Sequence, residues 1–149
     1  TCFSKMAVGG CFCGKVRIEY SGQPITSVSA LCHCFDCRKL TGTLYTYNFV
    51  FKMADLKITG SPKEVAKTAD SGNQIKNYFC SDCGTPLYGL KMESTGTPGE
   101  TVILRAGILD DIAVLNEHKP KVEIYTDGRV NWISPAEGAD QLIGMPPLP

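Results

Sequence analysis

The sequence predicts a mainly β protein built from short antiparallel sheets, and three observations support this fold class. Short segments that alternate apolar and polar side chains recur along the chain, glycine or proline lies in nearly every gap between them, and helical periodicity is weak throughout. The 149 residues have the size of one domain, and 43% hydrophobic with 20% charged residues is typical of a globular protein. We therefore expect a single β domain with one core.

The expected strands follow one another along the whole chain. Val16, Ile18 and Tyr20 alternate with charged residues, which predicts a half-buried strand after the first cysteines. The remaining expected strands are residues 28–31, 44–51, 56–59, 75–79, 86–90, 101–105 and 122–125, and short helical segments are expected at 35–40 and 111–117.

Four aromatic side chains share one face of the expected strand at residues 44–51. They are Tyr45, Tyr47, Phe49 and Phe51, spaced two residues apart. An aromatic stripe on a strand usually belongs to the core, so we expect these rings to be buried there. The alternative is that they line a substrate pocket.

Charge and hydropathy exclude several classes of partner. Fifteen Lys plus Arg balance fifteen Asp plus Glu, so the chain has no overall basic field that would attract nucleic acid or an anionic membrane. No apolar run approaches the roughly 18 residues of a membrane span, and the first residues lack the apolar segment of a secretory signal. We expect no nucleic-acid or membrane partner and a cytoplasmic location, with residues 1–8 as an N-terminal extension, 9–145 as the domain and 146–149 as a C-terminal tail.

Seven of the eight cysteines fall into three tight groups with the sequences CFC, CHCFDC and CSDC. Disulfide frameworks spread their cysteines so that bridges join distant loops, and cysteines two apart would form a strained ring if bridged. Thiolates that converge on a short turn instead share one soft cation such as zinc. A redox CxxC motif would explain CSDC but leaves the other two groups unexplained.

The seven clustered cysteines divide naturally into four and three. Cys11 and Cys13 precede an expected strand, while Cys80 and Cys83 follow another, so two adjacent strands would bring these pairs together. Four thiolates make a closed structural zinc site, which contributes free energy of folding because it joins distant parts of the chain.

Cys32, Cys34 and Cys37 then remain as a local cluster with one coordination position to fill. Catalytic zinc has three protein ligands and an open position, so this cluster predicts chemistry. The alternative is a closed structural site completed by Cys2, His33 or Asp36. His33 lies between two ligands, so its ring is expected to point away from a metal that Cys32 and Cys34 share.

These motifs also carry a resemblance to a known family. The segments GGCFCGKVRIEY, LCHCFDCRKLTG, NYFCSDCGTPLYG and LRAGILDD, followed by Trp132 and an acidic, glycine-containing stretch, resemble the glutathione-dependent formaldehyde-activating enzymes, a family that includes centromere protein V. The resemblance runs from about Gly9 to Met145. It implies a β-tent architecture, with a structural zinc on Cys11, Cys13, Cys80 and Cys83 and a catalytic zinc on Cys32, Cys34 and Cys37.

The resemblance implies a carbon–sulfur lyase that joins a thiol such as glutathione to a small aldehyde. Cationic side chains are needed to bind the two carboxylates of glutathione, and Arg38, Lys39 and Arg105 are candidates. His33 and Tyr45 have suitable chemistry to protonate the new hydroxyl group. We therefore predict Cys32, Cys34 and Cys37 as catalytic zinc ligands and Arg38, His33 and Tyr45 as substrate-binding residues.

Two alternative functions keep the zinc sites. In the first, the enzyme acts on a different electrophile or thiol conjugate in specialised metabolism. In the second, the chain is a non-enzymatic zinc module that binds a protein partner, as centromere protein V suggests within the family. The second alternative is weakened because this chain lacks a basic extension that would favour binding to polyanions.

Overall fold

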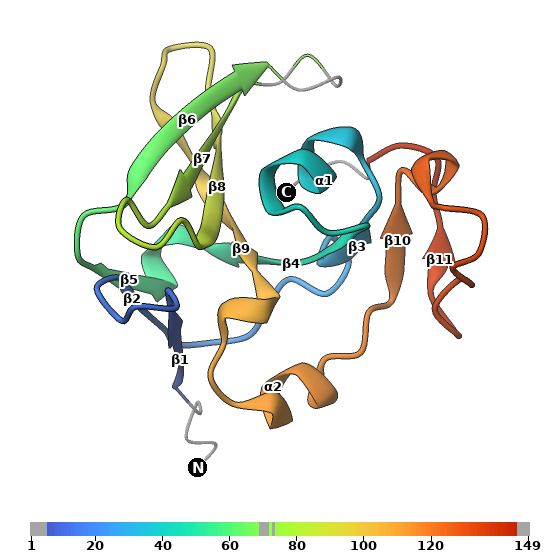
Figure 1. Ribbon diagram of the computed structural model, residues 1–149, viewed down its shortest axis with the longest axis horizontal. Helices are drawn as coiled ribbons and strands as arrows, with labels where there is room; N and C mark the ends of the chain where they lie inside the picture. The colour runs from blue at the N-terminus through green and yellow to red at the C-terminus, as the bar shows by residue number, and fades with distance from the viewer. Residues whose placement is uncertain (1–5, 69–71, 73, 146–149) are drawn as a thin grey trace.

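The computed structural model describes residues 6–68, 72 and 74–145, and it confirms a mainly β fold with two sheets (Figure 1). The smaller sheet has the strand order β1 (Ala7–Gly10), β2 (Arg17–Tyr20) and β5 (Leu56–Thr59). The larger sheet has the order β11 (Asp140–Gln141), β10 (Val122–Ile124), β3 (Ala30–Cys32), β4 (Thr46–Lys52), β9 (Pro98–Arg105), β8 (Pro86–Met92), β7 (Gln74–Phe79) and β6 (Lys63–Thr68).

Most neighbouring strands are antiparallel, but β10 pairs in parallel with both β3 and β11. Two short helices are present, α1 (Phe35–Thr41) and α2 (Ile112–Glu117), and short 3₁₀ turns occupy residues 53–55, 106–108 and 126–128. In Figure 1 the larger sheet bends around α1, so that β6 to β8 stand on one side of this helix and β10 on the other. No helix in the described part of the chain has the length and apolar character that a bilayer crossing requires.

Every strand and both helical segments expected from the sequence are present, with ends that differ by a few residues. Three strands were not expected, namely β1, β6 and β11. Glycines occupy half of β1, mostly exposed polar residues form the edge strand β6, and β11 has only two residues. In each case the partner strand provides the pairing, and the segment itself has no alternating pattern.

The main core lies between the two sheets. Ile18 and Tyr20 from the smaller sheet pack with Phe49 and Phe51 from β4, and the ring centroids of Tyr20 and Phe51 are 4.2 Å apart. Phe49 and Phe51 have no exposed surface, and burial of each such side chain contributes about 1.5–3 kcal/mol.

The core interpretation of the aromatic stripe is therefore confirmed for Phe49 and Phe51. Tyr47 is partly buried against the same cluster. Tyr45 lies just before β4 and is 39% exposed. The opposite face of β4 carries Asn48 and Val50, which are also buried, and this second face positions the site described next.

Candidate metal centres and the adjoining cavity

The first cysteine cluster contains Cys11, Cys13, Cys80 and Cys83, whose sulfur atoms all lie within 4.8 Å of one another. The Sγ atoms of Cys11 and Cys13 are 3.5 Å apart, and those of Cys13 and Cys80 are 3.7 Å apart. These separations are close to the roughly 3.8 Å expected between two sulfurs that bind one tetrahedral zinc at about 2.3 Å each. The donor set therefore fits a closed zinc site.

Two similar tight turns form this cluster. Gly14 N–H donates to the Cys11 carbonyl at 3.1 Å, and Gly84 N–H donates to the Cys80 carbonyl at 2.8 Å. Both glycines have a positive φ, 82° and 78°, which disfavours any residue with a Cβ. The glycine after each cysteine pair thus allows the chain to turn and direct both sulfurs to one point.

The cluster joins the two sheets, which corrects the expectation that adjacent strands hold the two pairs. Cys11 and Cys13 lie between β1 and β2 of the smaller sheet, while Cys80 and Cys83 lie between β7 and β8 of the larger sheet. Phe12 N–H donates to Thr85 Oγ1 at 3.1 Å across this junction. A metal here would therefore connect two separate sheets.

Local hydrogen bonds favour the thiolate form of Cys83 and Cys11 in the first cluster. At Cys13, a hydrogen bond from the Lys15 backbone lowers the pKa, but burial and the neighbouring thiols outweigh it and raise the pKa of Cys13 to about 12. The Thr85 hydroxyl lies 3.2 Å from Cys83 Sγ, and this contact is the main cause that lowers the pKa of Cys83 to about 5. Val16 N–H donates to Cys11 Sγ at 3.2 Å. Because thiolates are the form that binds zinc, these donors support the same conclusion as the sulfur separations.

The second cluster contains Cys32, Cys34 and Cys37, whose sulfurs also lie within 4.8 Å of one another. Cys32 ends β3, Cys34 is the N-cap of α1, and Cys37 lies in the first turn of this helix. Cys37 N–H donates to Cys34 Sγ at 3.3 Å, as expected for an N-cap side chain. A strand followed directly by a short helix thus brings three nearby cysteines to one point.

Arg105 is the charged neighbour of this second cluster. Its Nη1 donates to Cys37 Sγ at 3.6 Å and to Asn48 Oδ1 at 2.7 Å, while Nη2 donates to Asn77 Oδ1 at 3.1 Å. Arg105 is only 9% exposed, and within the described ranges no carboxylate forms an ion pair with it. The cysteine cluster is therefore the natural counter-charge of this guanidinium.

The pKa values of the three thiols in the second cluster are shifted in different directions, with that of Cys37 lowered and those of Cys32 and Cys34 raised. Hydrogen bonds from the neighbouring thiols lower the pKa of Cys37 most, and the charge of Arg105 lowers it further, against the opposing effect of burial. Hydrogen bonds to Cys34 and Cys37 together with burial raise the pKa of Cys32. A soft divalent cation would replace the protons on the other two sulfurs, so this donor set also fits zinc.

The described residues provide no obvious fourth ligand for the second cluster. Among the described residues, only the three cysteines bring ligand atoms together at this point, and the His33 ring points toward Glu123. Cys2, another candidate to close the site, lies outside the described residues. Asp36 lines the adjoining cavity without joining the three-sulfur group.

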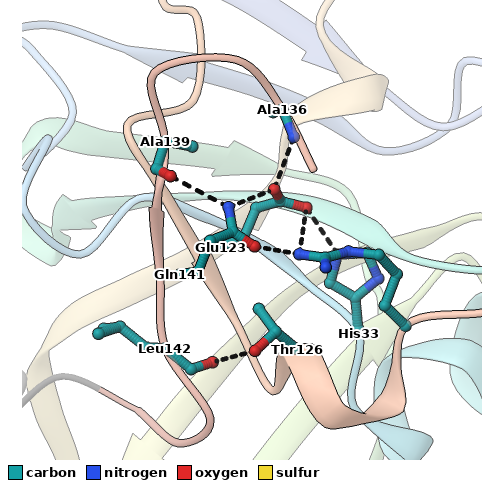
Figure 2. A network of polar contacts seen from close by, with 8 residues as sticks. His33, Glu123, Thr126, Ala136, Ala139, Gln141 and Leu142 are labelled. Carbon is teal, nitrogen blue, oxygen red and sulfur yellow. Dashed lines mark hydrogen bonds and ion pairs between the residues drawn. The ribbon is translucent and has the colours of Figure 1, made fainter. Parts of the chain in front are cut away.

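A buried polar network around Glu123 reaches the second cluster through His33, which lies between Cys32 and Cys34 in the sequence; Figure 2 shows the network. His33 Nε2 is 2.8 Å from Glu123 Oε1, and both side chains are 1% exposed. Glu123 Oε2 accepts hydrogen bonds from Ala136 N–H and Gln141 Nε2, each at 2.7 Å. Burial raises the pKa of Glu123, but these hydrogen bonds and the nearby charge of Arg129 outweigh it and lower the pKa to about 2.

This network ties the C-terminal segment to the cysteine cluster. Glu123 lies on β10, and Leu142 N–H donates to its carbonyl oxygen at 2.9 Å. Tyr125, two residues after Glu123, has a left-handed backbone with φ 54° and ψ 45°, which costs about 1 kcal/mol for a residue with a Cβ. Tyr125 and Met145 both line the cavity, so the network fixes one wall of it.

The three cysteines of the second cluster lie in the wall of a cavity of about 260 Å³. Strand pairing arranges its floor in two rows. The row nearest the cysteines is Ala30, Asn48 and Arg105 on β3, β4 and β9. The next row crosses β4, β9, β8, β7 and β6, which are neighbours in the sheet in this order. Its residues are Val50, Ile103, Gly89, Asn77 and Val65.

Some of the cationic and polar residues considered for substrate binding line the cavity, and others do not. Arg38, His33 and Tyr45 are not among the residues that line the cavity, whereas Lys39 and Arg105 are. The Arg38 guanidinium lies 5.8 Å from the Phe35 ring centroid, and the Tyr45 ring packs against His33 with centroids 5.3 Å apart. Their substrate-binding role remains a prediction, and the geometry gives priority to Arg105.

Sequence reasoning missed Asn48, Asn77 and Glu123. A signal was present, because each of these polar residues interrupts a strand-forming apolar segment: Asn48 before FVF, Asn77 before YF, and Glu123 between Val122 and Ile124. A polar side chain in a buried strand needs a partner, so such positions point to a polar network or a site.

Comparison with known proteins decides the family. Residues 6–128 match the family model described as glutathione-dependent formaldehyde-activating enzyme. The chain belongs to this family. The match includes all seven cysteines of the two clusters, and the mainly β fold with short antiparallel sheets agrees with what the resemblance implied.

Two curated relatives are distant from this member of the glutathione-dependent formaldehyde-activating enzyme family. Each carries the name "Putative glutathione-dependent formaldehyde-activating enzyme"; one is from Penicillium rubens and the other from Emericella nidulans. Each is 27% identical over 79 residues, which are 53% of this chain and 41% or 40% of the relative. The matched part of the chain thus spans about two fifths of the length of these relatives.

A solved structure of a Rhodobacter sphaeroides protein is also similar. It is 18% identical and has a TM-score of 0.49, and the match covers 91% of this chain and 98% of that chain.

Proposed function

We propose that this chain is a zinc-dependent carbon–sulfur lyase that joins a thiol such as glutathione to an aldehyde and catalyses the reverse cleavage. One observation carries the proposal: in a member of this family, three converging thiols form the wall of a cavity large enough for an organic substrate. The first cluster borders no such cavity among the described residues, and we assign it a structural zinc.

In the proposed reaction the thiol sulfur forms a bond to the aldehyde carbon. The C=O π electrons move to the oxygen, the thiol proton is released, and the oxygen takes up one proton, so no oxidant or reductant is needed. Zinc held by Cys32, Cys34 and Cys37 would supply an open coordination position and stabilise a thiolate near neutral pH.

The residues of this chain contribute charge and orientation. Asn48 and Asn77 hold the Arg105 guanidinium at the cysteine end of the cavity, where it offsets negative charge on sulfur. The described lining residues also include Lys39 and Asp36. Lys39 can pair with a carboxylate of glutathione and Asp36 with its ammonium group.

Metal binding through cysteine suits a reducing compartment. Both clusters need thiolates to bind metal, and oxidation to disulfides would remove these ligands. We therefore propose a cytoplasmic location, where such thiols remain reduced.

Binding of glutathione to zinc-loaded protein tests the proposal. Gently purified protein should contain between one and two zinc ions per chain, and calorimetry should detect glutathione binding with release of a proton. S-methylglutathione keeps every charged group but has no ionisable sulfur, so it should bind much more weakly. Absence of glutathione binding and of thiol–aldehyde conjugation in fully zinc-loaded protein would refute the proposed function.

A further inference from the structure

The polar groups that line the cavity beside the second cluster gather around the cysteines. Asn48, Arg105 and Asn77 lie there on the larger sheet, and Asp36 and Lys39 lie on α1. Ile124, Tyr125 and Met145 also pack at the cysteine end, whereas the row of the sheet beyond Asn48 and Arg105 contributes mainly aliphatic side chains: Val50, Ile103 and Val65, with Val28, Leu40 and Ile75 as further aliphatic lining residues.

Gly89 lies in the middle of the cavity floor, between Ile103 and Asn77 in the strand register. A Cβ at this position would lie 3.1 Å from Asn77 Oδ1 and 3.4 Å from Ile75 Cγ2. The glycine therefore leaves space for the Asn77 side chain, whose Oδ1 accepts a hydrogen bond from Arg105.

An open apolar cavity of this size needs an explanation. Protein interiors are close-packed, and voids larger than a water molecule are few. Water in a cavity needs two to four polar partners, which the aliphatic part of this wall does not offer. A well-formed apolar cavity beside a polar end is typical of a site that binds an organic ligand by its apolar body.

We propose that the aldehyde substrate carries an apolar chain of roughly six carbon atoms, which lies in this cavity while its carbonyl group faces the cysteine cluster. This inference rests on the proposed function. Formaldehyde has no chain to place against Val50 or Ile103. The cavity has a volume of about 260 Å³. One water molecule occupies roughly 30 Å³ in the liquid, and a methylene group has a similar size. The cavity therefore has room for a chain of several carbon atoms.

A series of unreactive primary alcohols tests the binding of the chain separately from catalysis. Calorimetry on zinc-loaded protein with ethanol, butanol, hexanol and octanol should show an affinity that rises about fourfold for each added methylene up to roughly six carbons and then levels off. Equal affinity for ethanol and hexanol, or no binding of hexanol, would overturn the proposal.

Two variants should shift the preferred chain length in opposite directions. Ile103→Ala enlarges the cavity and should move the highest kcat/KM with glutathione toward longer aldehydes, from hexanal toward octanal. Val65→Phe adds volume at the β6 end of the row, away from Arg105, and should move it toward butanal. Ile112→Ala is the matched control, because Ile112 on α2 is 67% exposed and does not line the cavity. If Val65→Phe fails to fold, the shift in Ile103→Ala still decides whether the cavity selects chain length.

The outcomes separate this inference from the proposed function. If formaldehyde and hexanal react equally well and the variants change neither, the lyase function stands and the apolar-chain inference is wrong. If the alcohols bind with the expected dependence on chain length but no aldehyde is conjugated to glutathione, the cavity binds apolar chains and the proposed function is wrong.

Discussion

The two cysteine clusters use the same donor atoms in opposite surroundings. The first joins two sheets through turns that are far apart in the sequence, and its sulfurs lie between loops. The second gathers three cysteines within six consecutive residues at the corner between β3 and α1, and its sulfurs line a cavity. The type of ligand alone therefore does not distinguish a structural metal site from a catalytic one.

The chain segments around each cluster decide its role. A metal that links distant segments contributes free energy of folding, because the unfolded chain does not hold its ligands together. A metal bound within one short segment contributes less to folding, since few residues separate its ligands. A metal at the second cluster would instead border the cavity, where the proposed reaction takes place.

The largest effect should come from removing one ligand of the first cluster. Cys83→Ser leaves three sulfurs to connect two sheets, so we expect the free energy of unfolding to fall by roughly 5 kcal/mol or more, or the domain not to fold. Cys34→Ser should retain most of the thermal stability and lose conjugation activity. Circular dichroism melts and zinc content measure both variants, and a near-native melt for Cys83→Ser would contradict this division.

A smaller effect should come from the network behind the second cluster. The folded pKa of Glu123 is about 2, below its ordinary value of 4.5, so its contribution to stability is present above pH 4.5 and is lost as the pH falls toward 2. Glu123→Gln should therefore destabilise the domain by up to about 3 kcal/mol at pH 6. Urea unfolding of both proteins between pH 6 and pH 3 measures this difference.

The difference between wild type and Glu123→Gln should shrink as the pH decreases. Acid also removes zinc, but the cysteine ligands are the same in both proteins, so metal loss largely cancels in the comparison. A difference that stays constant from pH 6 to pH 3 would show that the Glu123 carboxylate charge does not stabilise the fold.

The smallest effect should be confined to the metal of the second cluster. Arg105→Gln removes a charge-assisted contact to Cys37 and should weaken metal binding there about tenfold, measured by competition with a chelator. Arg105→Lys should restore part of the affinity because it keeps the charge. Arg38→Gln serves as the control, because Arg38 lies outside the cavity. Equal losses in Arg38→Gln and Arg105→Gln would contradict the assignment of Arg105.

Much of the fold was predictable because its signals are local. Alternating side chains placed most strands of the larger sheet, and glycine and proline marked their ends. The strands that were missed, such as the glycine-rich β1 and the two-residue β11, depend on their partners and have little pattern of their own. Strand pairing is a long-range contact, so its partners were not visible in the sequence.

By itself the sequence determined the division of seven cysteines into four and three, because cysteine spacing is a local property that the turns preserve. Only the tertiary structure decided what surrounds each cluster. It placed Asn48 and Val50, rather than the aromatic face of β4, along the cavity, and it brought Arg105 to Cys37 from 68 residues away. It also paired His33 with Glu123, 90 residues further along. The physical reason is that burial and charge at a site depend on segments that meet only when the sheets assemble.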